Sequence, residues 1–158
     1  MPFLVRSLAL SYVPAPRILV NIRKGRTAGA GLRPFIGFGN FRPATAAQLA
    51  ASFPPDRCGE DYRLLQALQP LPETRTQIAT IAQQLGASSS EVVLGEAFTK
   101  QRLAAADLGQ YRIILLATHA FLPANTLRCI TEPAIAVSPP PGAHDAADAF
   151  ERVGTSKS

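Results

Sequence analysis

The chain has 158 residues, which is enough for one domain and too few for two of ordinary size. Hydrophobic residues make up 47% and charged residues 17%, so the chain can bury a core, which excludes disorder of the whole chain. The net charge is +5, and the apolar start is interrupted by Arg6, Pro14 and Arg17, which leaves no run of the roughly 18 residues that cross a bilayer.

Two cysteines without a CxxC pair favour a reducing compartment, and we expect a cytoplasmic protein. Basic residues are concentrated at the start, because all eleven acidic residues lie from Asp56 onward. Such a start is compatible with a nucleic-acid-binding module over residues 1–42 or with a transit peptide. The cations are mostly isolated and no aromatic ladder accompanies them, so we favour an ordinary strand and helix with solvated arginines.

The first predicted elements are short and end at proline or glycine. Residues 3–13 are apolar and β-capable, and Pro14 ends this run, which predicts a strand. Residues 18–22 place their apolar side chains on one helical face and predict a helix before Gly25. Residues 34–39 then predict a short buried strand that is closed by glycine.

Helices dominate the middle of the chain. Short ones are predicted between prolines at 45–51 and 60–69. A longer helix begins at Thr74, which forms a capping box pattern with Gln77, and Gly86 is its predicted stop.

Strands and helices alternate again in the last third. Residues 91–95 predict a strand, and Thr99 can cap a short helix that runs to about Ala106. Residues 112–118 are almost continuously apolar, which is typical of a central parallel strand buried on both faces. The alternating order predicts an α/β fold, with a mostly parallel sheet and helices on both of its faces.

His119 follows directly after this last predicted strand. Reactive groups of parallel α/β sheets gather at the carboxyl ends of the strands, and an imidazole exchanges protons near neutral pH. His119 is therefore a candidate general acid or base. The alternative is a structural histidine held by hydrogen bonds, because a fold alone does not fix a function.

Short segments with recognisable spacing are distributed along most of the chain. They are Phe3 to Pro14, Phe35 to Gly39, Leu71 to Thr74, Val93 to Gly95 with Thr99, Asp107 with Leu108 and Tyr111, Tyr111 to His119, and Glu132 to Ile135. In this order they resemble the CHAT domain, a caspase-like cysteine peptidase module. The resemblance implies a caspase-like three-layer sandwich, a partial CHAT domain over residues 1–140, and a polar, Pro-rich to flexible tail over residues 141–158.

The resemblance also implies a cysteine–histidine dyad, in which a thiolate attacks a peptide carbonyl and backbone N–H groups stabilise the oxyanion. It makes His119 the dyad histidine and the backbone N–H of Ala120 a donor of the oxyanion hole. The family usually has glycine at that second position; alanine keeps the N–H but restricts φ. No cofactor and no metal are implied.

The nucleophile of the family lies in a Ser-Ala-Cys motif after the next parallel strand, and this chain contains no such motif. We therefore assign no nucleophile and expect the C-terminal strand or strands of the sheet to be missing. The sheet would then have an unpaired edge, which invites partner strands or self-association.

The two cysteines and the second histidine are weaker candidates. Cys58 lies in a polar turn far upstream of His119, where the fold would not place a nucleophile. Cys129 lies ten residues after His119 and is the better alternative, although a small buried hydrophobe is the commoner role there. His144 lies in the polar tail, where we expect it to be exposed, and this scatter gives little support for a zinc site.

The sequence thus favours the N-terminal portion of a CHAT-type cysteine peptidase domain, which carries the dyad histidine and does not cleave peptides alone. The alternative is a non-catalytic protein-interaction module, or pseudo-peptidase. Expected partners are proteins or peptides, tetratricopeptide-repeat regions among them, whereas a membrane or a nucleic acid is not expected.

Overall fold

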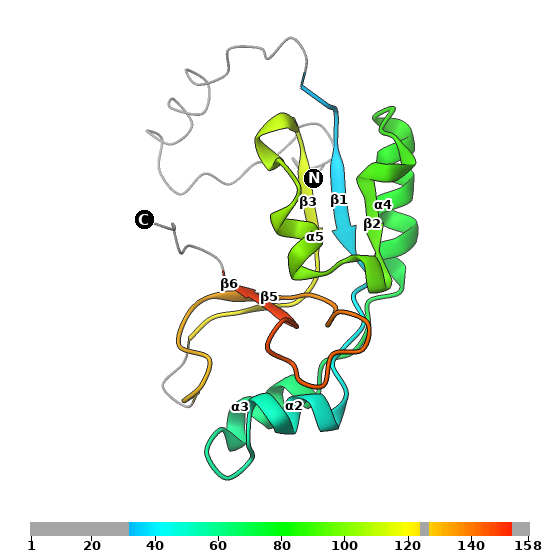
Figure 1. Cartoon of the computed structure of the whole chain (residues 1–158). Coiled ribbons are helices and arrows are strands. Elements are labelled where there is room, and N and C mark those ends of the chain that lie inside the picture. Colours follow the sequence, from blue (N-terminus) through cyan, green and yellow to red (C-terminus); the bar gives the residue numbers. More distant parts are fainter. Residues whose placement is uncertain (1–31, 124–126, 153–158) are drawn as a thin grey trace, which may run out of the picture. The chain divides into compact units, whose positions relative to one another are not determined.

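The computed structural model of the chain describes residues 32–123 and 127–152 (Figure 1). The strand predicted over 3–13 and the helix predicted over 18–22 lie outside the described residues. The helices are α2 (Ala46–Ser52), α3 (Gly59–Gln66), α4 (Glu73–Gln84) and α5 (Lys100–Ala104), with single turns at Ser89–Glu91, Gly95–Ala97 and Leu108–Gln110. The strands are β1 (Ile36–Gly39), β2 (Val92–Leu94), β3 (Ile114–Ala117), β4 (Ala120–Phe121), β5 (Ala134–Ala136) and β6 (Phe150–Arg152).

Three parallel strands form the main sheet, in the order β2-β1-β3. The predicted strands at 34–39, 91–95 and 112–118 are therefore confirmed, but the central one is β1. The prediction that residues 112–118 form a central strand buried on both faces is wrong, because Ile114 and Leu116 are 43% and 41% exposed. A continuous apolar run indicates a strand, but it does not show whether both faces and both edges of that strand are covered.

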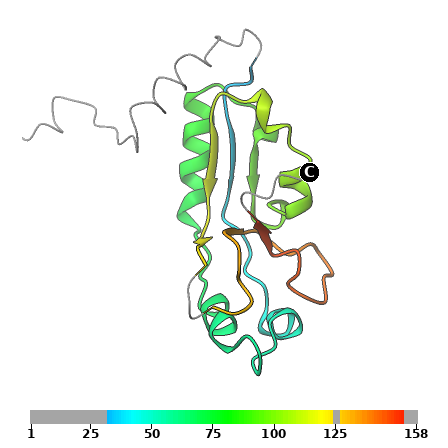
Figure 2. The same cartoon turned by 90° about the vertical axis from the view of Figure 1, so that its left-hand side faces the viewer.

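One face of the parallel sheet is covered by α4. Gly37 and Gly39 lie on this face, and a Cβ atom at either position would come within 2.5 Å of the Ile78 side chain. The two glycines thus allow α4 to lie directly on the central strand, where Ile78 is fully buried. Figure 2 shows α4 and α5 on opposite sides of the three strands.

The opposite face of β1 carries Ile36 and Phe38, both fully buried. They belong to a core cluster that includes Leu103 of α5 and Phe98, which lies just before that helix. The ring centroids of Phe38 and Phe98 lie 5.5 Å apart. The helix predicted after Thr99 is confirmed, because the Thr99 hydroxyl accepts the N–H of Arg102 at its first turn. Helices on both faces of a parallel sheet confirm the mixed α/β class.

The predicted capping box of α4 is wrong. The helix begins at Glu73, so Thr74 lies inside its first turn and is buried. The Thr74 hydroxyl donates to the Leu71 carbonyl (2.6 Å) and accepts the N–H of Asn40 (2.8 Å). Thr74 therefore joins the start of α4 to the end of β1. At the other end of the helix, Gly86 has φ +67°, as its predicted role as a helix stop requires.

A second, antiparallel sheet follows, in the order β4-β5-β6. Its third strand, together with Ala146 and Ala149, which are 0% and 2% exposed, belongs to the segment that the sequence predicted to be a polar, flexible tail. That prediction is corrected up to residue 152, because alanines and Phe150 pack against the core there. His144 is exposed, as expected. None of the described helices is long and apolar enough to cross a membrane.

A substitution that adds one methyl group to β1 tests the close contact between β1 and α4. We expect Gly37→Ala to lower the free energy of unfolding by about 1–3 kcal/mol, because its Cβ would overlap Ile78 and Phe35. Gly59→Ala is the matched control, since no atom lies within 4 Å of the added Cβ. Urea unfolding of both variants measures the difference; equal stabilities would contradict the close approach of α4.

Candidate functional site

The structure places His119 two residues after β3, at the carboxyl end of the parallel sheet. Phe41, which follows the end of β1, lies beside it: the two ring centroids are 5.6 Å apart and the planes are at 85°. The edge of one ring therefore meets the face of the other. Because Phe41 is only 2% exposed, it gives the partly exposed imidazole a rigid apolar wall.

A backbone carbonyl fixes the tautomer of His119. The Nε2 atom lies 3.0 Å from the carbonyl oxygen of Gln69, in the segment between α3 and α4. A carbonyl oxygen can only accept, so Nε2 carries the proton and donates it to this hydrogen bond. In the neutral ring, Nδ1 is then the atom with the free lone pair, which makes it the proton-accepting atom of His119.

The backbone on both sides of the imidazole is held by β5. The Thr118 hydroxyl donates to the Ala136 carbonyl (2.7 Å), and the Ala136 N–H donates to the His119 carbonyl (2.9 Å). Two bonds to one residue of a buried strand limit the motion of the backbone that carries His119.

Ala120 begins β4, where it lies opposite Ile135. Opposed residues of an antiparallel ladder alternate between pairs that share hydrogen bonds and pairs that do not. Because His119 and Ala136 form a bonded pair, the Ala120–Ile135 pair is a non-bonded one. The N–H of Ala120 therefore points away from β5, and the residue is exposed. This orientation suits a backbone donor, the role that the sequence resemblance implies.

Among the described residues, β3 pairs with β1 alone, and its other edge is open. Ile36 donates its N–H to the carbonyl of Ile113 (3.0 Å). In a parallel ladder only every second residue of a strand bonds to a given neighbour, so this bond identifies the residues of β3 that face β1. The backbone groups of Ile114 and Leu116 consequently point away from β1. The same two residues have exposed side chains, so this edge carries apolar surface and backbone groups that no described strand pairs.

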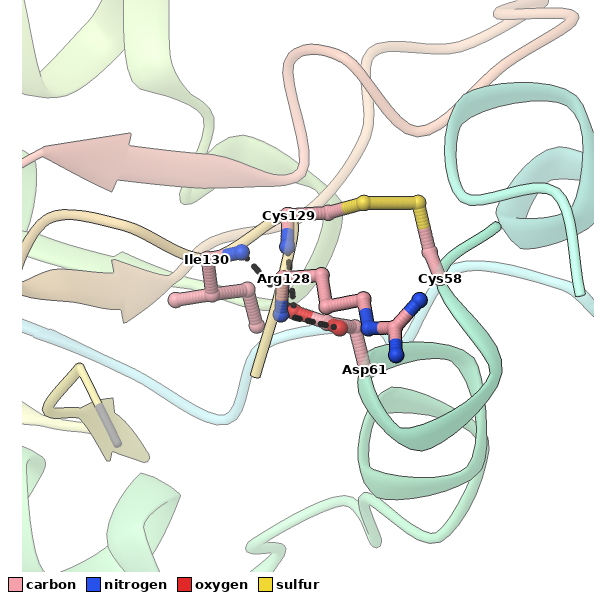
Figure 3. Close-up of a disulfide and its surroundings, with 5 residues drawn as sticks. All are labelled: Cys58, Asp61, Arg128, Cys129 and Ile130. Carbon is pink, nitrogen blue, oxygen red and sulfur yellow. Dashed lines mark hydrogen bonds between the residues drawn. A yellow bond between two sulfur atoms is a disulfide. The ribbon is translucent and has the colours of Figure 1, made fainter. Parts of the chain in front are cut away.

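Cys58 and Cys129, the two alternative nucleophiles, form a disulfide, with their Cα atoms 5.8 Å apart (Figure 3). These are both cysteines of the sequence, so the chain with this bond formed contains no thiol. Cys58, predicted to lie in a polar turn, is 5% exposed at the start of α3. Cys129, expected to be buried, is exposed instead. The expectation of a reducing compartment did not predict this disulfide, and the expectation that Cys129 is buried is wrong.

Asp61 holds the backbone around Cys129. Its two carboxylate oxygens accept the N–H groups of Arg128 (3.0 Å), Cys129 (3.2 Å) and Ile130 (2.8 Å) (Figure 3). Asp61 is fully buried, and this desolvation raises its pKa, but the three hydrogen bonds outweigh it and hold the pKa below the ordinary value of 3.8. The carboxylate is thus charged, and its charge is balanced by backbone donors.

The two described cations of the basic start are engaged by acids of the same chain. Arg33 forms an ion pair with buried Glu91 (2.6 Å), and Arg42 forms one with Glu96 (3.5 Å). This pairing favours structural roles for these two arginines over contacts with phosphate. Within the described ranges, no group of three or more His, Cys, Asp or Glu side chains is arranged to hold a metal ion.

Sequence reasoning missed three parts of this site. The Gln69 carbonyl has no signal in the sequence, because every residue has such a group. The edge contact of Phe41 and the three bonds of Asp61 join segments that are far apart in the chain. For the bonds of Asp61, the nearest signal in the sequence was its position, three residues after Cys58 in the first turn of a helix.

A parallel α/β sheet with a histidine at the carboxyl end of one strand fits the class of domain that the sequence resemblance implied, the caspase-like peptidases. The family model of the CHAT domain matches residues 2–145. The chain belongs to the CHAT domain family and is thus a domain of the caspase-like peptidase family. No curated protein and no solved structure matches it.

The tautomer of His119 is open to direct measurement. We expect the neutral imidazole to be protonated at Nε2, because the Gln69 carbonyl accepts that proton. Imidazole ¹⁵N chemical shifts distinguish the two ring nitrogens, and exposed His144 serves as the internal reference. A proton on Nδ1 of His119 would contradict the assignment.

The pH dependence of stability should reveal the role of Asp61. Its pKa in the folded state is below the unfolded value of about 3.8, so its contribution is complete above that pH and is lost as the pH falls through the folded pKa. We expect Asp61→Asn to reduce the free energy of unfolding by about 1–3 kcal/mol at pH 7. In urea titrations this difference should shrink below about pH 4. A difference that is the same at pH 7 and pH 2 would show that the charge of Asp61 is not involved.

Proposed function

We propose that this chain supplies the histidine half of a CHAT-type cysteine peptidase site and that it does not cleave peptides alone. The observation that carries the proposal is the position of His119. Its Nε2 donates to the Gln69 carbonyl, which leaves Nδ1 as the proton-accepting atom of the neutral ring, and it stands two residues after β3, whose outer edge has no partner strand among the described residues. The chain has two cysteines, and the disulfide occupies both.

The outer edge of β3, which no described strand pairs, supports the idea that the thiol is brought by an added strand. A strand that pairs in parallel with β3 would bond to the outward groups of Ile114 and Leu116 and cover their exposed side chains. Its carboxyl end would lie at the same edge of the sheet as His119, because parallel strands end together. A cysteine directly after such a strand would reach the neighbourhood of the imidazole.

In this mechanism the residues of the chain move protons and bind charge. Nδ1 of His119 takes the proton of the thiol and later gives it to the leaving amine. The Gln69 carbonyl keeps the ring in the tautomer that this step needs and stabilises the imidazolium through the Nε2–H bond. The N–H of Ala120, which points away from β5, donates to the oxyanion that forms on the substrate carbonyl.

The domain is a caspase-like three-layer sandwich over about residues 1–140, and its substrates are proteins or peptides. Its partners include tetratricopeptide-repeat regions, and it acts in the cytoplasm. The family match over residues 2–145 supports the peptidase-family part of this proposal.

A second candidate function is that of a non-catalytic interaction module. The exposed apolar edge of β3 favours it, because an open edge can bind a partner strand without any chemistry at His119. The two functions differ in whether the added strand brings a thiol that His119 activates.

An experiment with a supplied strand tests the proposal. The nucleotide sequence is read beyond Ser158 in all frames, and a strand that ends in Ser-Ala-Cys, native or taken from a family member, is expressed with the chain. We expect a thiol-directed peptidyl probe to label this cysteine, and His119→Gln to reduce the labelling rate at least about 100-fold. His144→Gln is the matched control and should change the rate less than twofold.

The chain alone should not be labelled by the same probe. Labelling of the chain alone that disappears in both Cys129→Ala and His119→Ala would contradict the proposal, because the chain would then contain its own dyad. A strand that binds without His119-dependent labelling would favour the interaction module instead.

A further inference from the structure

The disulfide joins two segments that are also joined by a second, independent attachment. Cys58 lies at the start of α3 and Cys129 between β4 and β5, and 71 positions separate them in the sequence. Asp61, on the first turn of the same helix, accepts the backbone N–H groups of residues 128, 129 and 130. In the chain with the disulfide formed, α3 therefore holds the Cys129 backbone by hydrogen bonds as well as by the bond between the sulfur atoms.

The two cysteines differ in exposure. Cys58 is buried at 5% exposure, whereas Cys129 is exposed and lines a cavity of about 260 Å³ together with Phe53, Phe121 and Phe150. A thiol reagent in solution can thus approach Cys129 first. The preceding residues, Arg57 and Arg128, line a neighbouring cavity of about 500 Å³ together with the carboxylates of Asp56, Glu60 and Asp61, and Figure 3 shows the Arg128 side chain extending toward the start of α3.

We propose that Cys58 and Cys129 form a reversible redox site that exchanges with a dithiol, and that Asp61 is the positioning residue that keeps the two thiols in place after reduction. The partner class is a dithiol reductant, a small molecule or a protein with a CxxC pair. The proposal does not depend on the peptidase assignment, because no step of it involves His119.

A thiolate of the dithiol attacks Sγ of Cys129, the bond between the two sulfur atoms breaks, and Cys58 leaves as a thiolate that takes up a proton. The second thiol of the reductant then attacks the mixed disulfide and releases Cys129. The reductant loses two electrons and becomes a disulfide, and the chain gains two thiols.

Asp61 should affect the equilibrium because its hydrogen bonds raise the effective concentration of one thiol at the other. The coupling is reciprocal: a bond that survives reduction and holds Cys129 near Cys58 also favours closure of the disulfide. Asp61→Asn removes the charge that the three N–H groups bind. It should therefore lower the equilibrium constant for disulfide formation by about tenfold or more.

The test uses the full chain equilibrated in buffers of graded ratios of reduced to oxidised dithiothreitol. Iodoacetamide trapping and mass spectrometry then give the fraction of reduced chain. We expect the wild type to be reduced in one two-electron step and to re-form the Cys58–Cys129 bond within the monomer. Asp61→Asn should be reduced at a ratio about tenfold lower, while Asp56→Asn, the matched control at an exposed position of the same segment, should stay within twofold of wild type.

Hydrogen exchange separates this role from a general loss of structure. In the reduced wild type, the amides of residues 128–130 should stay protected, and in reduced Asp61→Asn they should lose protection while those of β1 keep it. A Cys58→Ser/Cys129→Ser double variant should also keep the protection of residues 128–130. The proposal is overturned if that variant or the reduced wild type unfolds, or if the two aspartate variants show the same equilibrium.

Discussion

The arrangement of this domain depends on how closely α4 can lie against the central strand. Gly37 and Gly39 leave no side chains on that face of β1, so Ile78 fills the space directly above the backbone. This contact fixes the start of α4, where the buried Thr74 hydroxyl bonds to both Leu71 and Asn40. The chain just before α4 is thereby held at the carboxyl end of the sheet, and it is from there that the Gln69 carbonyl reaches the His119 ring. The lack of side chains at Gly37 and Gly39 thus determines where the Gln69 carbonyl can bind the His119 imidazole.

The site itself is assembled from three stretches that are attached to different elements. Thr118 and His119 are fixed by the backbone of β5, Phe41 belongs to the turn after β1, and Gln69 lies between α3 and α4. Each attachment acts on a different property of the histidine: its backbone, the apolar side of its ring, and its tautomer. What is left open is the side along β3, where Ile114 and Leu116 are exposed. The described part of the chain thus combines a histidine of defined tautomer with a strand edge that no described strand pairs.

Periodicity and glycine placement were enough to predict β1, β2 and β3, the helix that stops before Gly86, and the short helix after Thr99. They were not enough to order the strands. Residues 112–118 are as apolar as a central strand, and only the partners of β3 show that it lies at an edge among the described strands. Thr74 resembled a helix cap because its spacing to Gln77 is right, yet its hydroxyl is used by a tertiary contact with Asn40. Local sequence cannot show such competition between local and long-range hydrogen bonds.

The position of His119 at a strand end was predictable from the order of elements, whereas the Cys58–Cys129 pairing was not, because the two residues meet only after the chain has folded. This bond closes a covalent ring that contains α3, α4, β2, α5, β3, His119 and β4, with β1, α2, β5 and β6 outside it. A protease that cuts once anywhere inside the ring would leave two pieces still linked by the sulfur atoms. The histidine would stay attached to its neighbours after such a cut, and the pieces could part only when a reductant opens the ring.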